Sequence, residues 1–184
     1  ISVGRLVPAK GQLDLVDAVA ELPDELREGL EVDLIGASDA SDPGYIEQLQ
    51  ARILERGLDR VVRVELDLPD DALRDRYDAA SVFVSTSRHE GFCVPVVEAI
   101  ASGCRVVTTD AGALPETVGP CGALVPVGDI GALRSALGDA LAAGPLDARE
   151  VEARTAHLRT YSQESFRRRL LDEVGRLLPV GGPG

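Results

Sequence analysis

The sequence predicts an α/β protein built on a doubly wound parallel sheet of six strands in the order 3-2-1-4-5-6. Short apolar runs alternate one for one with segments whose apolar residues recur at helical spacing, which is the pattern of such a sheet. Proline or glycine marks the start or the end of several helical segments. Right-handed crossovers between parallel strands then favour this strand order.

Six strands are expected from short runs rich in Val, Ile and other apolar residues. They cover residues 1–4, 31–36, 61–66, 81–85, 105–109 and 123–127. The run at 81–85 reads Ser-Val-Phe-Val-Ser and predicts a buried strand, because strands covered by helices on both faces read as continuous apolar runs.

Helices are expected between and after these strands. Their predicted ranges are 12–22, 42–57, 69–77, 95–102, 129–143, 148–159 and 162–178. Pro23 follows the first of them, and Pro43, Pro69 and Pro95 stand in the first turn of the next three, where a missing N–H breaks no helical hydrogen bond. Gly103 provides the C-cap of the fourth.

A length of 184 residues fits one domain of ordinary size. We expect residues 1–145 to form a Rossmann-like unit and residues 146–178 to form C-terminal helices. Residues 179–184, which include Gly-Gly-Pro-Gly, are expected to be a disordered tail. The chain contains no Met and starts inside a predicted strand, so we expect it to be part of a longer protein.

The charge balance argues against two classes of partner. The formal net charge is −12, from 31 acidic and 19 basic residues, which leaves no basic face for nucleic acid or for an anionic membrane. No apolar run approaches the roughly 20 residues that span a bilayer. Cys93, Cys104 and Cys121 are too few for a disulfide scaffold and fit no zinc-ligand spacing. We therefore expect reduced thiols in a cytoplasmic protein, and no metal site.

The loop after the first strand, residues 4–11, is a candidate anion site. It places Arg5 and Lys10 just before the helix predicted over 12–22, and helix N-termini favour anions. Lys10 is the only lysine in the chain. The spacing matches neither the P-loop nor the dinucleotide fingerprint, so a solvated pair of cations in an ordinary loop is the alternative interpretation.

The loop after the fourth strand is the second candidate. Gly91 lets a ligand approach the backbone, and a helix that begins at Pro95 leaves the amides of residues 91–94 at its N-terminus. Glu90 stands at the end of the strand and Glu98 about one turn into the helix, where carboxylates can accept hydrogen bonds from ribose hydroxyls. Alternatively, Glu98 only interacts favourably with the helix dipole.

Strands 1 and 4 are neighbours in the predicted order, so the two loops face one crevice beyond the carboxyl ends of the strands, where such sheets bind ligands. The crevice would hold two helix N-termini, two cations and two carboxylates. These groups suit phosphate and polyol together, and a sugar nucleotide carries both. His89 in the second loop is by itself more typical of a structural histidine.

Further segments, which together cover about residues 1–178, match segments of a known protein family. The matching segments are Gly4-Arg5-Leu6, Lys10-Gly11, Leu34-Ile35-Gly36, Tyr77-x-x-Ala80-x-x-Phe83-Val84, His89-Glu90-Gly91-Phe92, Glu98-Ala99-Ile100-Ala101-Ser102-Gly103 and Gly112-x-x-Pro115-Glu116-x-x-Gly119. In this order and spacing they resemble the C-terminal, donor-binding domain of retaining glycosyltransferases of the GT-B group 1 family (GT4). Glu90 and Glu98 resemble the two ends of that family's E-x7-E motif.

The resemblance implies a role for each matching position. Arg5 and Lys10 would hold the diphosphate of the donor and stabilise the departing phosphate, and Glu90 would contact the donor sugar near the reacting centre. These three are the candidate catalytic residues. The candidate donor-binding residues are Gly4, Leu66, Asp67, His89, Gly91, Phe92, Cys93, Val94 and Glu98. Among them, Glu98 would bind the ribose, and residues 66–68 would lie near the base.

The resemblance also implies a nucleotide-diphosphate sugar, such as a UDP- or GDP-sugar, as the donor, with no cofactor and no metal. Three positions depart from the family pattern: Asp67 and Cys93 stand where Gly is usual, and Thr86 stands where Pro is common.

GT-B enzymes have two Rossmann-like domains and bind the acceptor mainly on the N-terminal one, which this chain would lack. The helix predicted over 162–178 resembles the family's crossover helix. We therefore expect the chain alone to bind donor weakly and to catalyse no transfer, with the acceptor unknown. Any contact with the inner face of a membrane would come through the absent domain. Two alternatives stay open: a sugar-nucleotide epimerase on the same fold, and a non-catalytic nucleotide-sugar-binding module.

Overall fold

The structure is a computed structural model that describes all residues except 38–41, 43, 163 and 166–184. Nearly all of the helix predicted over 162–178, and the whole of the predicted tail at 179–184, lie outside the described residues. No helix in the described part of the chain is both long and apolar enough to cross a membrane.

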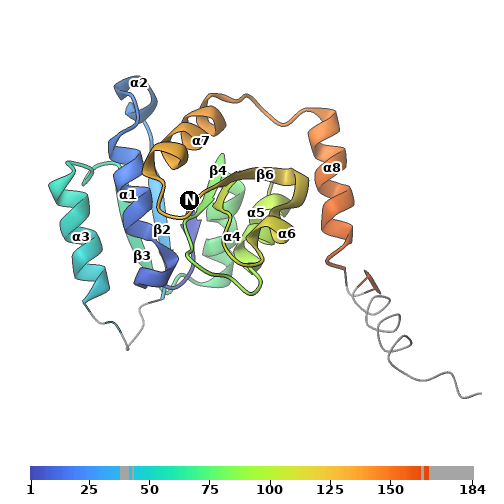
Figure 1. The fold of residues 1–184 in the computed structure, drawn as a ribbon, viewed down its shortest axis with the longest axis horizontal. Helices are drawn as coiled ribbons and strands as arrows, with labels where there is room; N and C mark the ends of the chain where they lie inside the picture. The colour runs from blue at the N-terminus through green and yellow to red at the C-terminus, as the bar shows by residue number, and fades with distance from the viewer. Residues whose placement is uncertain (38–41, 43, 163, 166–184) are drawn as a thin grey trace, which may run out of the picture.

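The strands form two parallel sheets of three strands each (Figure 1). The strands are β1 (Ser2–Val3), β2 (Val32–Gly36), β3 (Val62–Leu66), β4 (Val82–Ser85), β5 (Arg105–Thr109) and β6 (Gly122–Val125). Their order is β1-β2-β3 in one sheet and β4-β5-β6 in the other. All six predicted strands are therefore present, and the predicted neighbours within each half are confirmed.

The prediction of one continuous six-stranded sheet is corrected to two sheets. Residue Ile1, next to β1, provides the connection between them: its nitrogen donates to the carbonyl of Val82 at 2.8 Å, and its carbonyl accepts from the amide of Val84 at 2.9 Å. Because β1 has only two residues, it does not continue this contact as a ladder along β4.

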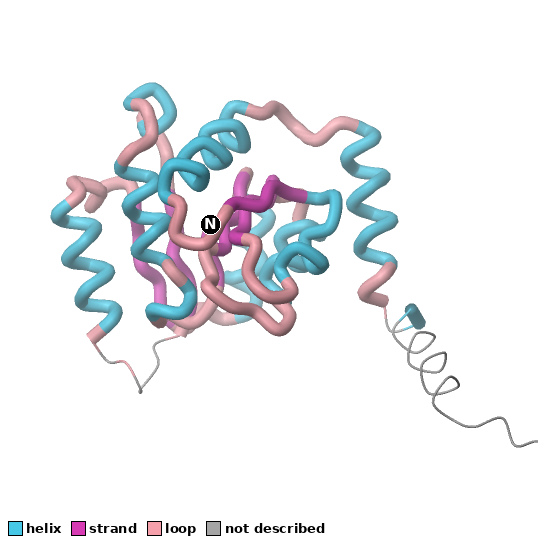
Figure 2. Tube along the Cα trace, viewed as in Figure 1, coloured by secondary structure: helices cyan, strands magenta, loops and turns pink. Residues whose placement is uncertain are grey.

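The helices alternate with the strands as the apolar spacing predicts (Figure 2). They are α1 (Gln12–Ala20), α2 (Asp24–Arg27), α3 (Tyr45–Glu55), α4 (Asp70–Ala79), α5 (Val94–Ala101), α6 (Leu114–Val118), α7 (Ile130–Ala142) and α8 (Ala148–Arg159), with 3₁₀ turns η1 (Pro8–Lys10) and η2 (Gly119–Cys121). The apolar spacing did not predict α2 and α6. Both have only four or five residues, too few to show a helical period.

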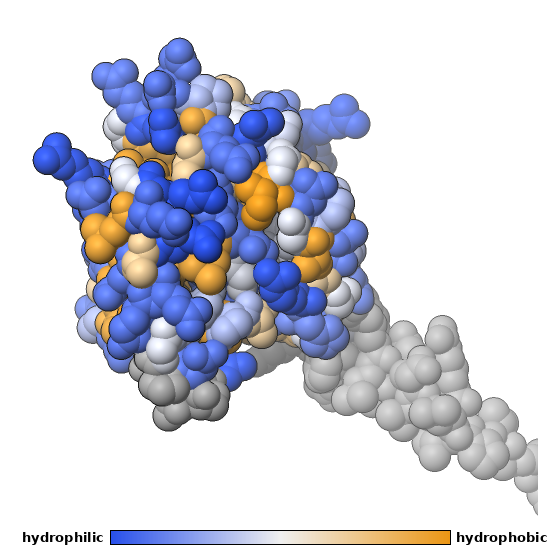
Figure 3. Space-filling model, turned by 60° about the vertical axis from the view of Figure 1, so that its left-hand side comes forward, coloured by the Kyte–Doolittle hydropathy of each residue, from blue (hydrophilic) through white to orange (hydrophobic). Residues whose placement is uncertain are grey.

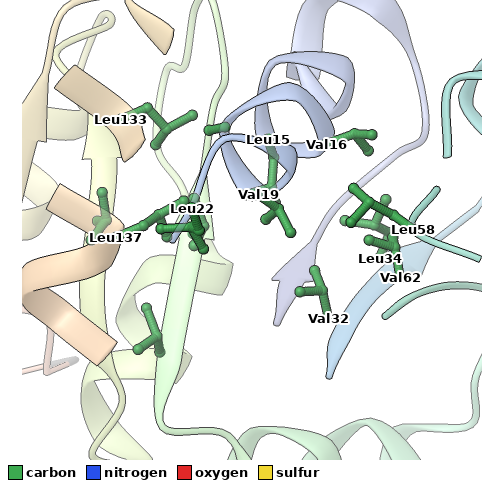
Figure 4. Packing of buried hydrophobic residues seen from close by; sticks show 14 of the residues in the cluster. Leu15, Val16, Val19, Leu22, Val32, Leu34, Leu58, Val62, Leu133 and Leu137 are labelled. Atoms are coloured by element: carbon green, nitrogen blue, oxygen red, sulfur yellow. The ribbon is translucent and has the colours of Figure 1, made fainter. Parts of the chain in front are cut away.

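The core has one apolar cluster on each face of the sheets. In the first, Leu15 and Val19 of α1 lie between Leu133 and Leu137 of α7 and the strand residue Leu34 (Figure 4). The second cluster joins α4, α5 and α6 to the other face of β4 and β5. Helices on both faces make the strands buried and apolar, as the sequence predicted for residues 81–85.

The alternation of side chains along the central strands separates the two clusters. Val82 and Val84 of β4 belong to the first cluster, and Phe83 between them belongs to the second. Val107 and Val106 of β5 divide in the same way. This is the period of two expected of strands that are packed on both faces.

Arg154 fixes α8 to the second sheet. Its guanidinium is buried and donates to the carbonyls of Cys104 at 2.6 Å and Cys121 at 2.9 Å, one just before β5 and the other just before β6. Burial also lowers the pKa of Arg154. A buried charge of this kind is tolerated because both terminal nitrogens of the guanidinium donate hydrogen bonds.

The surface in Figure 3 is mainly hydrophilic, and its apolar residues lie in small separate groups. This distribution agrees with the charged composition of the chain, 27% Asp, Glu, Lys and Arg.

Replacing Arg154 with Met tests the attachment of α8. The change leaves two buried carbonyls without their donors, so we expect the free energy of unfolding to fall by about 1–3 kcal/mol. Urea denaturation measures it. Arg149→Met, at an exposed position on the same helix, is the matched control and should have little effect. Equal losses in the two variants would contradict the role given to Arg154.

Candidate functional site

Two loops meet beyond the carboxyl ends of β1 and β4. The amide of Arg88 donates to the carbonyl of Ala9 at 2.8 Å, and the hydroxyl of Thr86 donates to the carbonyl of Lys10 at 3.0 Å. We call residues 4–11 and 86–93 together the loop junction. The fold therefore brings together the two loops that the sequence analysis selected.

Gly11 allows this contact. It has φ +68°, and a Cβ built on it would lie 2.3 Å from the carbonyl oxygen of Thr86. That distance is far below van der Waals contact, and the neighbour is backbone, which cannot rotate away. A residue with a side chain at position 11 would separate the two loops.

A third loop, between β5 and α6, supports the junction from the other side. The amide of Ala113 donates to the carbonyl of Glu90 at 2.8 Å, and the hydroxyl of Thr109 donates to the carbonyl of Ser87. Gly112 has φ +59°, and a Cβ there would lie 2.2 Å from the carbonyl oxygen of Glu90. The backbone around Glu90 is thus fixed by the end of β5.

Lys10 and Glu90 form an ion pair within the junction, between Nζ and Oε1. The hydroxyl of Ser87 donates to the same carboxylate oxygen at 2.8 Å. The two charged side chains are only 23% and 10% exposed, so water screens their attraction less than that of a surface pair. The structure brings two of the three candidate catalytic residues into direct contact.

The third candidate catalytic residue, Arg5, is exposed on the same loop. Its carbonyl accepts a hydrogen bond from the side chain of Gln12 at 2.9 Å, and Gln12 in turn accepts one from the hydroxyl of Tyr45 at 3.1 Å. The neighbouring residue Gly4 donates its amide to the carbonyl of Ile35 in β2 at 2.9 Å. The backbone of this loop is therefore anchored at both α1 and β2.

The segment from His89 to Val94 leads into α5, which begins at Val94. His89 and Gly91 are exposed, Val94 is half-exposed, and Cys93 is buried. Burial raises the pKa of the Cys93 thiol to about 11, and the nearby Glu90 carboxylate adds to the increase. The thiol is therefore protonated at neutral pH, and it belongs to the core.

Phe92 lies against the end of α8. Its ring is 5.5 Å from the ring of Tyr161, and Tyr161 makes an edge contact with His157 at 5.3 Å between ring centroids. The Phe92 side chain is half-exposed, and one of its sides is covered by this contact.

The other predicted donor-binding residues lie on or next to α5 and β3, outside the loop junction. Glu98 is exposed on α5 and lines a groove shared with α4, and Leu66 and Asp67 stand at the end of β3. Asp67 has φ +52°, a left-handed conformation that favours glycine. Glycine is the usual residue at this position in the family that this chain resembles. The backbone there keeps its glycine-like conformation although the residue is Asp.

The sequence did not predict the roles of three residues that shape the junction. Ser87 holds the Glu90 carboxylate, Gly112 makes room for the Glu90 backbone, and Arg88 forms an ion pair with Asp14 of α1 at 3.0 Å. Gly112 stands in a segment that matches the family pattern, but that match predicted no contact with the Glu90 backbone. Ser87 and Arg88 had no signal beyond their place in the selected loop.

Substituting Gly112 by Ala tests the steric requirement. The new methyl group would meet the backbone of Glu90, so we expect a loss of about 2–4 kcal/mol in the free energy of unfolding, measured in urea. Gly29→Ala is the control: it has φ +76° but nothing within 4 Å of the added Cβ. It should show only the smaller cost of a positive φ, and a loss as large as that of Gly112→Ala would contradict the packing argument.

The three cysteines provide a second test. All are buried, and burial raises the pKa of each thiol. Since the thiolate is the reactive form, we expect iodoacetamide to leave the folded chain unlabelled at neutral pH and to label all three sites after unfolding. Mass spectrometry reads the result. Rapid labelling of Cys93 in the folded chain would show that its thiol faces solvent.

Comparison with known proteins identifies the family. Residues 1–156 match the family model described as glycosyl transferases group 1. An MMP alpha-(1->4)-mannosyltransferase of Mycolicibacterium hassiacum is 38% identical over 135 residues, which are 72% of this chain and 31% of that protein. A D-inositol 3-phosphate glycosyltransferase of Corynebacterium jeikeium is 33% identical over 185 residues, which are 99% of this chain and 44% of that protein.

Solved structures agree on the fold. Anabaena Alr3699/HepE in complex with UDP and glucose has a TM-score of 0.77 at 23% identity, over 95% of this chain and 48% of that one. The C-terminal domain of a group 1 glycosyl transferase (LpcC) from Francisella tularensis has a TM-score of 0.70 at 21% identity, over 89% of this chain and 84% of that one. The chain spans less than half the length of the two curated relatives. It belongs to the group 1 glycosyltransferase family, and its fold is that of the C-terminal domain of a GT-B enzyme.

Proposed function

We propose that this domain binds a nucleotide-diphosphate sugar, such as a UDP- or GDP-sugar, as the donor half of a retaining glycosyltransferase. The observation that carries the proposal is the partly buried pair of Lys10 and Glu90 where two loops meet at the carboxyl edge of the sheets. Ligands of doubly wound proteins bind at this edge. The UDP in the Anabaena HepE structure supports a donor of this class.

Lys10 would change partners when the donor binds. A diphosphate offers more negative charge than one carboxylate, and it would draw the ammonium of Lys10 away from Glu90. Arg5, exposed on the same loop, adds a second cation, and the N-terminus of α5 adds backbone amides. Glu90, released from Lys10 but still hydrogen-bonded by Ser87, could then accept hydrogen bonds from hydroxyls of the donor sugar.

The same groups would act in the transfer. Negative charge grows on the departing phosphate as the bond to the sugar breaks, and cations already in place stabilise that charge. In the family that this chain resembles, the leaving phosphate can also take the proton of the acceptor. The acceptor would bind to the N-terminal domain, so we expect the chain alone to bind donor and to transfer nothing.

The nucleoside part of the donor would bind to the remaining residues predicted from the sequence. Glu98 would bind the ribose, and Leu66 and Asp67 would lie near the base. For the whole scaffold we propose that the two sheets act as one platform in the order 3-2-1-4-5-6, joined through Ile1. We also propose that the enzyme is cytoplasmic and needs no metal.

Of the alternatives, the epimerase is not favoured, because the matched family model and the curated relatives named above are glycosyltransferases. A non-catalytic module that still binds nucleotide sugar would keep the same donor site. Activity of the full-length enzyme distinguishes it, since a module of that kind would bind donor without any transfer.

Calorimetry with UDP, GDP and ADP tests the donor site in the chain itself. We expect binding of at least one nucleotide, and Lys10→Ala should weaken it roughly 10-fold or more, because a charge-assisted hydrogen bond is lost. Arg60→Ala, an exposed arginine outside the junction, controls for the change in net charge. Absence of binding to all three nucleotides at millimolar concentration would overturn the proposal.

The same calorimetry also tests whether Lys10 leaves Glu90 for the phosphates of the donor. Glu90→Gln removes the competitor for Lys10, so we expect it to bind UDP as tightly as the parent chain or more tightly. In the full-length enzyme the same substitution should lower the transfer rate. If Glu90→Gln weakened UDP binding as much as Lys10→Ala, the two residues would act only as one structural unit.

A further inference from the structure

A groove of about 460 Å³ runs between α4 and α5, apart from the loop junction. Tyr77 of α4 and Glu98 of α5 both line it. Glu98 is the residue proposed above to bind the ribose, and the inference below rests on that proposed function.

Tyr77 is almost completely buried, with 3% of its surface exposed, and its ring stacks on Phe83 at 6.2 Å between centroids. Its hydroxyl is also buried and has no hydrogen-bond partner among the described residues. A buried hydroxyl without a partner costs free energy, whereas Phe at this position would keep the ring packing without that cost. Packing alone therefore does not account for a hydroxyl here.

Glu98 is the charged side chain that acts most on this hydroxyl. Burial raises the pKa of the Tyr77 phenol, and the negative charge of Glu98 raises it further. The phenol is therefore protonated and a hydrogen-bond donor at neutral pH, and the Glu98 carboxylate, which lines the same groove, is close enough to act on it. Glu98 is exposed and lies within reach of this hydroxyl, but the Tyr77 hydroxyl makes no hydrogen bond of normal distance and angle to it in the structure.

We propose that Tyr77 is a positioning residue: its hydroxyl donates a hydrogen bond to the Glu98 carboxylate when that side chain receives the ribose hydroxyls of a bound nucleotide. One carboxylate oxygen would accept from Tyr77, and the other would accept from the ribose. The buried hydroxyl thus has its partner in the ligand-bound state, and the rigid ring of Tyr77 fixes where that partner lies.

The test compares UDP with 2′,3′-dideoxy-UDP by calorimetry, in the parent chain and in Tyr77→Phe. The dideoxy nucleotide lacks the hydroxyls that Glu98 would bind. We expect Tyr77→Phe to weaken UDP binding roughly 3- to 10-fold, as for the loss of one hydrogen bond, and to leave dideoxy-UDP binding unchanged. Ser102→Ala, which removes a hydroxyl from the same groove, is the matched control and should change neither affinity.

The outcomes separate the inference from the function on which it rests. If the parent chain binds UDP but Tyr77→Phe binds it equally well, the positioning role is wrong and the donor site stands. An equal loss for UDP and dideoxy-UDP, or the same loss in Ser102→Ala, assigns the effect to general disturbance of the groove and also overturns the role. If the parent chain binds neither nucleotide, the donor-site proposal fails first and the inference fails with it.

Adding Glu98→Gln to Tyr77→Phe completes the comparison. If Tyr77 acts through Glu98, the double variant should bind UDP no more weakly than Glu98→Gln alone, because interacting residues are non-additive. Fully additive losses would mean that Tyr77 affects the nucleotide by another route. Unfolding in urea verifies that Tyr77→Phe keeps the fold, which it should, since the removed hydroxyl has no partner in the unliganded chain.

Discussion

The candidate site depends on two places where backbone approaches backbone. Gly11 lies against the carbonyl of Thr86, and Gly112 lies against the carbonyl of Glu90. In both contacts the neighbour is main chain, so no side-chain rotation could make room for a larger residue. These contacts fix the loops after β1, β4 and β5 against one another, and Lys10 meets Glu90 although 80 positions separate them in the sequence.

In the proposed binding mode, the ion pair explains how a chain with a net charge of −12 would offer a site for an anion. Lys10 is paired with Glu90, which the phosphates of the proposed donor would replace, and Arg88 on the same loop as Glu90 is paired with Asp14. In the proposed binding mode the cation at the site is already oriented and partly desolvated. Binding then exchanges one acceptor for another, which costs less than ordering a free, hydrated lysine.

Much of this arrangement could be predicted from the sequence, and the exceptions have physical reasons. Apolar runs and helix-end signals located all six strands and the longer helices, because those patterns are local. The division into two sheets depends on the length of β1, and the pairing of Lys10 with Glu90 depends on tertiary packing that no local pattern encodes. The roles of Gly112 and Ser87 at the junction were missed for the same reason, since those roles lie in what the two residues contact.

In the proposed binding mode the two carboxylates of the E-x7-E pattern do different work, because the first turn of α5 lies between them. Glu90 precedes the helix and is fixed by Lys10 and Ser87, whereas Glu98 lies in its second turn and faces α4. Each helical residue rises about 1.5 Å, so Val94 and Glu98 differ by roughly 6 Å along the axis. In the proposed binding mode a nucleotide sugar spans this turn, with its sugar at Glu90, its phosphates at Lys10 and its ribose at Glu98. The unpartnered hydroxyl of Tyr77 stands at the ribose end of that path, where a donor to Glu98 would be needed.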